Sequence, residues 1–173
     1  EVGLVGLPNA GKSTLLGRLS SARPKVAAYP FTTLAPSLGI VELPGHRRII
    51  MADIPGLIAG AHGGAGLGDT FLRHVERTQV LAHLVDVCPA GGGDPVEDLA
   101  TINRELGEYS PALAAKPQVV VANKMDLTGA EEGLDRLRDA VDGEVVPISA
   151  ATGRGLRELT ERLWDALHPE DAP

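Results

Sequence analysis

Residues 6–13 read Gly-Leu-Pro-Asn-Ala-Gly-Lys-Ser, directly after the apolar run Val2–Val5 and directly before Thr14-Leu15-Leu16. This is the pattern G-x-x-x-x-G-K-[ST] between a predicted strand and a predicted helix. Its two glycines allow the backbone to fold closely around an anion, so that successive N–H groups and the positive end of the helix point at phosphate. The predicted phosphate-binding loop consists of Gly6, Leu7, Pro8, Asn9, Ala10, Gly11, Lys12, Ser13 and Thr14.

Two side chains of this loop have expected roles of their own. Lys12 would reach the outer phosphates as a point charge, and the Ser13 hydroxyl would bind Mg²⁺. The alternative is a glycine-rich turn with a stray lysine, and the flanking strand and helix disfavour it.

The composition of the chain indicates which broad kinds of protein it can be. Its 173 residues, 43% of them hydrophobic, suit a single domain. A net charge of −7 argues against a free-standing nucleic-acid or membrane-surface binder, although a local basic patch stays open. No apolar stretch approaches the roughly 18 residues of a membrane span. The single cysteine, Cys88, excludes an internal disulfide. We therefore expect an intracellular protein with no membrane attachment and no sequence-specific nucleic-acid binding.

Apolar runs alternate with segments of helical periodicity, which predicts a three-layer α/β domain. Predicted strands are Val2–Leu7, Leu38–Leu43, Arg47–Asp53, Val80–Val87, Gln118–Ala122 and Glu144–Ile148. The turn signal Pro44-Gly45-His46 predicts an antiparallel hairpin at one edge of this mostly parallel six-stranded sheet. Further helices are expected after the N-cap Asp94, along Leu134–Val141 and along Leu156–Leu167.

Two stretches do not fit this alternation. Residues 22–37 contain three prolines without a clear period, and residues 55–68 contain six glycines. Long loops in compact domains are usually functional or disordered. Both stretches lie near the carboxyl ends of strands, where open α/β sheets bind ligands, and we interpret them as mobile ligand-contacting segments. Plain flexible loops are the alternative.

The sequence Asp53-Ile54-Pro55-Gly56 ends an apolar strand. An aspartate at this place would hold Mg²⁺ through a water molecule, and the Gly56 N–H would approach the terminal phosphate. Alone the pattern D-x-x-G is weak, but its position after a strand and together with the phosphate loop strengthens it.

The sequence Asn123-Lys124-Met125-Asp126 also follows an apolar strand. The Asp126 carboxylate can accept two hydrogen bonds from guanine N1–H and N2–H₂, whereas adenine offers no such pair and would leave it unpaired. Lys124 would lie along the base, and Asn123 would connect this loop to the phosphate loop. After the next strand, backbone amides of Ser149-Ala150-Ala151 could meet the guanine carbonyl oxygen. A polar turn at each strand end is the alternative.

A threonine in the segment Tyr29-Pro30-Phe31-Thr32-Thr33 could bind Mg²⁺ while a γ-phosphate is present, and hydrolysis would then release the segment. The residues alone leave open which threonine does so, and a hydrophobic clasp by the aromatic side chains is equally open.

In this order the motifs resemble the Obg family of P-loop GTPases, in the translation-factor-related class. Besides the phosphate loop, N-K-M-D and S-A, the specific matches are Y-P-F-T-T-L-x-P (29–36), D-I-P-G-L-I-x-G-A (53–61) and G-L-G-x-x-F-L-R-H-x-E-R-T (66–78). The resemblance covers residues 2 to about 167. It implies that Thr33 is the metal ligand beside Ser13, and that the nucleotide also contacts Phe31, Thr32, Leu34 and Ala35.

The position after Gly56, where Ras-like proteins carry a water-orienting glutamine, is Leu57. A leucine cannot orient water. Related GTPases with asparagine at the place of Asn9 bind K⁺ there, which suggests a K⁺ ion that bridges phosphate oxygens. The alternative is that Asn9 only braces the loop, and turnover in KCl against NaCl separates the two. The expected catalytic residues are thus Lys12, Thr33, Gly56 and Asn9.

The leading hypothesis is Mg²⁺-dependent hydrolysis of GTP to GDP and phosphate, slow in isolation. A nucleotide-controlled binding module with negligible hydrolysis is the second hypothesis, which Leu57 supports. An ATP-using kinase or ATPase conflicts with Asn123–Asp126. We expect a monomeric domain over 1–168, excised from a longer protein, with a tail or linker over 169–173. The resemblance further implies a cytoplasmic parent protein that acts on the large ribosomal subunit during its assembly.

Overall fold

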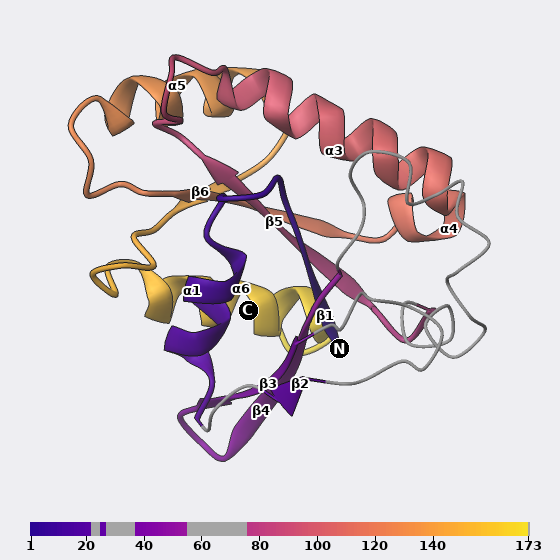
Figure 1. Cartoon of the computed structure of the whole chain (residues 1–173). Coiled ribbons are helices and arrows are strands. Elements are labelled where there is room, and N and C mark those ends of the chain that lie inside the picture. The colour runs from indigo at the N-terminus through magenta and orange to yellow at the C-terminus, as the bar shows by residue number, and fades with distance from the viewer. Residues whose placement is uncertain (22–24, 27–36, 55–75, 173) are drawn as a thin grey trace.

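The computed structural model describes residues 1–21, 25–26, 37–54 and 76–172 (Figure 1). The strands are β1 (Val2–Val5), β2 (Lys25–Val26), β3 (Ser37–Leu43), β4 (Arg47–Asp53), β5 (Val80–Asp86), β6 (Gln118–Asn123) and β7 (Val145–Pro147). The helices are α1 (Lys12–Leu19), α3 (Pro95–Tyr109), α4 (Pro111–Ala114), α5 (Ala130–Ala140) and α6 (Leu156–Leu167).

The described strands form one sheet in the order β2-β3-β4-β1-β5-β6-β7. From β4 to β7 all neighbours are parallel, whereas β3 runs antiparallel to β4 and β2 antiparallel to β3. Parallel strands end at the same edge of a sheet. Asp53, Asp86 and Asn123 therefore close three strands on one side of the molecule.

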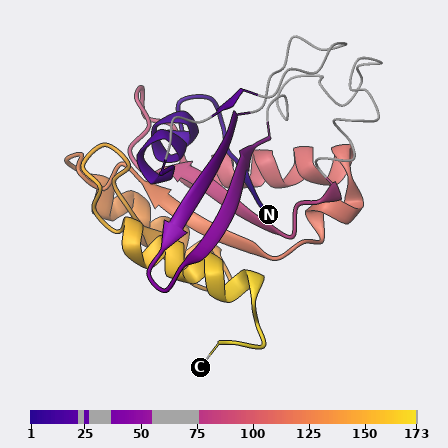
Figure 2. The same cartoon turned by 90° about the horizontal axis from the view of Figure 1, so that it is seen from below.

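Alternation along the strands gives the sheet two buried faces. On β5, Val80, Ala82 and Leu84 belong to the core that includes leucines of α1 and α6. The opposite side of the sheet packs against α3, α4 and α5 through two further clusters that contain Leu81 and Val85. Helices accordingly cover both faces of the sheet, which confirms the predicted three-layer arrangement (Figures 1 and 2).

Helix α3 begins as the sequence predicts. The Asp94 side chain accepts a hydrogen bond from the Val96 N–H at 3.0 Å, and Pro95 occupies the first turn. Proline fits there because its missing N–H would have had no partner within the helix. The hairpin β3–β4 also turns at Pro44–His46, with Gly45 and His46 in the left-handed region (φ 82° and 60°).

The edge of the sheet differs from the prediction. Lys25–Val26, placed in an irregular loop by the sequence, pairs as β2 with Ser37 and Leu38. The antiparallel strand β3 is therefore second from the edge, and the described residues contribute seven strands to the sheet. A strand of two residues is too short to produce a period, but its backbone pairs with N–H and C=O groups of β3 that would otherwise face water.

Candidate functional site

The predicted phosphate loop is a tight turn between β1 and α1. Ala10 N–H donates to the Leu7 carbonyl at 3.1 Å, and Asn9 and Gly11 have φ of 68° and 102°. A Cβ at Gly6 would lie 2.6 Å from the Leu84 carbonyl oxygen, and one at Gly11 would collide with the Asn123 amide. Both positions therefore need glycine because neighbouring protein atoms leave no room for a side chain, whereas their closeness to an anion stays a prediction.

The start of α1 is open to an anion. Gly11 occupies the N-cap, no side chain caps the helix, and its first turn carries no acidic residue. Four N–H groups at a helix start need partners outside the helix, and the helix dipole favours a negative charge there. Pro8, Asn9, Ser13 and Thr14 are exposed at this place, whereas Ala10 is buried in the core.

Lys12 and Asp53 meet beneath the loop. Lys12 Nζ lies 3.2 Å from Asp53 Oδ1, and both side chains are largely buried. Their geometry is that of an ion pair rather than an aligned hydrogen bond, and Oδ1 has no hydrogen-bond partner among the described residues. A buried carboxylate oxygen of this kind is the type of ligand that Mg²⁺ prefers. Both the donor chemistry and the orphaned oxygen therefore fit a magnesium ion.

Asn123 connects three loops. Its Nδ2 donates to the Ala10 carbonyl at 2.8 Å, and its Oδ1 accepts from the Ala150 N–H at 3.0 Å. The side chain is buried. The predicted connection to the phosphate loop is confirmed, and the sequence did not indicate the second bond. Because the Ala150 N–H is used by Asn123, the Ala151 amide is the remaining candidate for a base carbonyl.

Lys124 and Asp126 are each held by a neighbour. Lys124 Nζ donates to Asp86 Oδ2 at 2.7 Å, and the Ser149 hydroxyl donates to Asp126 Oδ1 at 2.8 Å. Ser149 therefore acts through its side chain, where the sequence suggested a backbone amide. Asp126 is exposed. A carboxylate accepts about four hydrogen bonds, so Asp126 keeps capacity for a base.

Besides Ala10 and Ala150, three more predicted contact residues have side chains that pack in or against the core. Met125 packs against α5, Ile54 packs against α3, and Leu7 packs partly against the same cluster as Ile54. Their apolar side chains are better buried than set beside phosphate, and only their backbones can contribute to a site. The remaining predicted site residues lie outside the described residues: Phe31, Thr32, Thr33, Leu34, Ala35, Pro55, Gly56 and also Leu57.

Asp86, at the end of β5, was missed by the sequence analysis. A charged residue that closes the apolar run Val80–Val85 at the same edge as Asp53 and Asn123 was the available signal.

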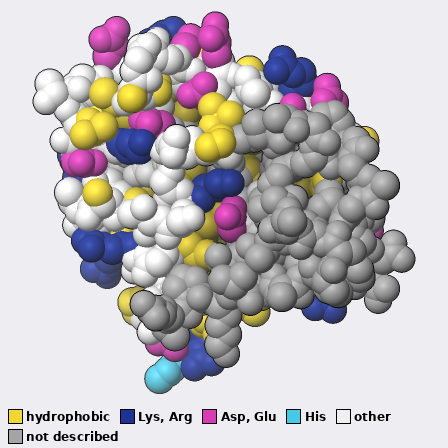
Figure 3. Space-filling view, viewed as in Figure 1, with side chains coloured by type: hydrophobic (Ala, Val, Ile, Leu, Met, Phe, Trp, Pro, Cys, Tyr) yellow, Lys and Arg dark blue, Asp and Glu magenta, His cyan; other side chains and the backbone are white. Residues whose placement is uncertain are grey.

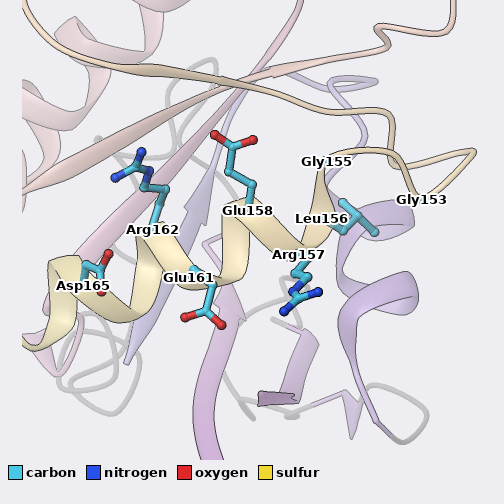
Figure 4. A pocket seen from close by; sticks show the side chains of 8 residues that line it. All are labelled: Gly153, Gly155, Leu156, Arg157, Glu158, Glu161, Arg162 and Asp165. Carbon is cyan, nitrogen blue, oxygen red and sulfur yellow. The ribbon is translucent and has the colours of Figure 1, made fainter. Parts of the chain in front are cut away.

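A surface hollow of about 620 Å³ lies along α6 and is bordered at one end by Gly153 and Gly155, which follow the Ser149–Ala151 loop (Figure 4). It is open and lined by acidic and basic side chains together, among them Arg157, Glu158 and Asp165. None of the predicted phosphate, base or metal residues lines it. The candidate functional site is therefore the edge of the sheet at the carboxyl ends of β1, β4, β5 and β6.

These features define a nucleotide-binding domain of the P-loop class, and comparison with known proteins identifies its family. The chain belongs to the 50S ribosome-binding GTPases, whose family model matches residues 1–124.

The predicted resemblance to the Obg family is confirmed among curated proteins. GTPase Obg of Desulforudis audaxviator is 57% identical over 178 residues, covering 100% of this chain and 42% of that protein. GTPase Obg of Heliobacterium modesticaldum is 59% identical over 169 residues, covering 96% of this chain and 38% of the relative. The chain thus spans about two fifths of these relatives.

Solved structures confirm the P-loop GTPase fold. The cytosolic domain of L. pneumophila FeoB matches with a TM-score of 0.68 and 27% identity, over 95% of this chain and 69% of that one. A variant of Aquifex aeolicus Era bound to GDP and AlF₄⁻ matches with a TM-score of 0.67 and 28% identity, over 95% of this chain and 56% of that one. Among the described residues, no helix has the length and apolarity needed to cross a bilayer.

Proposed function

We propose that this chain binds GTP at the described edge of the sheet and hydrolyses it to GDP and phosphate. The observation that carries the proposal is the Asn123 side chain. One buried amide holds the phosphate loop, through Ala10, and the loop of Ala150 at fixed positions around the N-K-M-D segment. Phosphate recognition and base recognition are therefore built as one unit.

In this proposal the Asp126 carboxylate makes the site select guanine over adenine. Ser149 orients it, and the remaining lone pairs accept from guanine N1–H and N2–H₂. Lys124 lies along the base, and the Ala151 amide meets the carbonyl oxygen. Against adenine the carboxylate would lose water without gaining a donor, which is the kind of mismatch that gives strong discrimination.

The first prediction is that Asp126→Asn raises the dissociation constant for GDP by about a hundredfold or more, because a bidentate charged acceptor is lost. Isothermal titration measures it, with xanthosine diphosphate as the matched ligand. Xanthine carries a carbonyl where guanine carries the amino group, so the asparagine amide can pair with it. Unchanged GDP affinity, or equal loss for both nucleotides, would contradict the assignment of Asp126.

For hydrolysis, Lys12 neutralises charge on the outer phosphates and the N–H groups at the start of α1 hold them in place. Ser13 and Thr33 are the proposed direct ligands of Mg²⁺, and Asp53 the ligand through a water molecule. When bound, this ion neutralises charge that develops on the phosphate oxygens. The Gly56 N–H approaches the terminal phosphate, and Lys12 exchanges its pairing with Asp53 for pairing with the nucleotide.

We assign to Asn9 the binding of a K⁺ ion that adds positive charge beside the phosphates, since Leu57 offers no group to orient water. Asn9 is exposed at the tip of the loop, with φ of 68°. The alternative is that asparagine occurs here only because it tolerates this left-handed backbone conformation.

The second prediction separates these two roles with Asn9→Gly, because glycine keeps the left-handed conformation and removes the amide. We expect GTP turnover to be faster in KCl than in NaCl for the original chain, by about tenfold, and equal in both salts for the variant. If K⁺ still stimulates turnover in Asn9→Gly, or if the original chain turns over equally fast in both salts, the role of Asn9 is only to give the loop its backbone conformation.

The second candidate function is a nucleotide-controlled binding module, favoured by Leu57 and by the small share of its relatives that the chain spans. Single-turnover GTP hydrolysis with and without K⁺ distinguishes it from an enzyme. We further propose that the domain is a cytoplasmic monomer and that its parent protein binds the large ribosomal subunit, as the family name and the Obg relatives suggest. The domain's net charge of −7 favours ribosome contacts outside it.

A further inference from the structure

Asp86 uses both of its carboxylate oxygens at the edge of the candidate site. Oδ2 accepts from Lys124 Nζ at 2.7 Å, and Oδ1 accepts from the Cys88 N–H at 2.9 Å. The Asp86 side chain is only 13% exposed and that of Lys124 31%. A short, charge-assisted hydrogen bond in such a place is stronger and more geometrically defined than an ion pair in water.

Lys124 is thereby held at both ends. Its backbone has φ of 73°, a region that lysine rarely adopts, and follows directly on the buried Asn123. Its ammonium group is fixed by Asp86. A lysine stem normally samples many rotamers, and anchoring its far end removes most of them before a ligand arrives.

We propose that Asp86 is a positioning residue for guanine binding, which holds the Lys124 stem where it lies along the plane of the base. The inference rests on the proposed role of the N-K-M-D segment. In this proposal Asp86 acts through Lys124 rather than on the nucleotide, because its side chain is largely buried and each of its oxygens already accepts from a protein donor. Its contribution is preorganisation, so its loss shortens the lifetime of the complex more than it slows association.

The test begins with Asp86→Asn, which keeps an acceptor for the Cys88 N–H but replaces the oxygen that accepts from Lys124 with an NH₂ donor. We expect the dissociation constant for GDP to rise about tenfold, mainly through faster release of a fluorescent GDP analogue measured by stopped flow. Unchanged affinity and release would overturn the proposal.

Asp94 provides a matched control within the same chain. Its Oδ1 also accepts an N–H two residues further on, from Val96, and its Oδ2 also accepts from a basic side chain, Arg136. Asp94→Asn therefore makes the same chemical change at the start of α3, at a side chain whose hydrogen bonds go to Val96 and Arg136 rather than to Lys124. We expect GDP affinity within about twofold of the original chain. An equal loss in both variants would mean a general structural effect and overturn the proposal.

A double-mutant cycle tests whether Asp86 acts through Lys124. Lys124→Met keeps an apolar stem but removes the ammonium group that Asp86 holds. In that background Asp86→Asn should change the GDP dissociation constant less than twofold. A full tenfold effect there would overturn the proposal, because a positioning role requires its target.

Two further measurements keep the result decisive. If Asp86→Asn does not fold by circular dichroism, Asp86→Glu replaces it in the cycle, since it keeps the charge and displaces it by one methylene. Asp126→Asn is measured in parallel. If that variant binds GDP normally, the proposed guanine site itself is wrong. If it loses GDP while Asp86→Asn does not, only the positioning role fails.

Discussion

His83 is a titratable side chain enclosed between the sheet and α3. It is fully buried on β5, its Nδ1 lies 3.4 Å from Gln118 Oε1, and its Nε2 has no partner among the described residues. Burial lowers the pKa of His83 to about 4, because the charged imidazolium would lose its hydration. The sequence does not indicate this burial, because a histidine within a strand can be either buried or exposed.

The third prediction follows from that lowered pKa. Between pH 6.5 and 4 the unfolded chain binds a proton at His83 that the folded chain does not, so the free energy of unfolding falls as the pH falls. From pH 7 to 5 the loss from this group is about 2 kcal/mol. Urea unfolding at both pH values measures it.

The variant His83→Met should lose this part of the pH dependence, whatever its stability at pH 7. His46→Asn is the control, because His46 is exposed in the hairpin turn and asparagine tolerates its positive φ. A pH dependence that persists undiminished in His83→Met would contradict the assignment.

Single site residues were predictable from the sequence where the chemistry requires a particular amino acid at a fixed distance along the chain. Gly6, Gly11, Lys12 and Asn123 are of this kind, and the structure brings them together. The place of Asp86 at the end of an apolar run was visible in the sequence, but its contact with Lys124 was not predictable, because the contact depends on the neighbouring strand β6 and on no spacing along the chain.

At the scale of elements, the hairpin β3–β4 is attached to α6 by Arg47. Its guanidinium makes two 2.8 Å hydrogen bonds to the Glu161 carboxylate and a third to the Pro44 carbonyl. It also lies over the Trp164 ring, 5.2 Å from the centroid. The hydrogen bonds from Arg47 lower the pKa of the Glu161 carboxyl. One side chain thus connects the turn of the hairpin to the last helix.

The fourth prediction is that Arg47→Met lowers the melting temperature by about 3 °C, because a bidentate contact and the aromatic contact are both lost. Arg48→Met is the matched control on the same strand. Arg48 faces Glu42 at 3.5 Å with both side chains exposed, and pairs of this kind contribute little. Equal melting temperatures for the two variants, measured by circular dichroism, would show that the Arg47 contact does not hold the hairpin.

Elements were predictable from sequence where they are long enough for a period. Strands β3 and β4 and helix α6 have near-predicted bounds because apolar residues recur on one face. Helix α5 begins at Ala130, four residues before the predicted stretch. The short pieces β2 and α4 were not predicted. Lys25–Val26 forms a strand only because β3 lies beside it, and Pro111–Ala114 forms one turn capped by the Ser110 hydroxyl.

At the scale of the whole molecule, the topology determines the site more than any local feature. Side chains from β1, β4, β5 and β6 meet because these strands are parallel neighbours. The described part of the face in Figure 3 carries acidic and basic side chains together, in keeping with a net charge of −7 without a single charged patch over it. Positive charge for phosphate is therefore local, supplied by Lys12 and the start of α1.

The attachment of the hairpin to α6 gives this protein a built-in optical probe. Trp164 is its single tryptophan, and its ring contacts both the Arg47 guanidinium and the His168 ring, whose centroid lies 3.9 Å away. Indole emission therefore reports on one junction only, at the end of the hairpin opposite Asp53. Far-UV dichroism averages over every helix. Both signals can be followed during one thermal unfolding experiment. A difference between their midpoint temperatures would show that the hairpin detaches from α6 at a different temperature from that at which the helices unfold, without any introduced label.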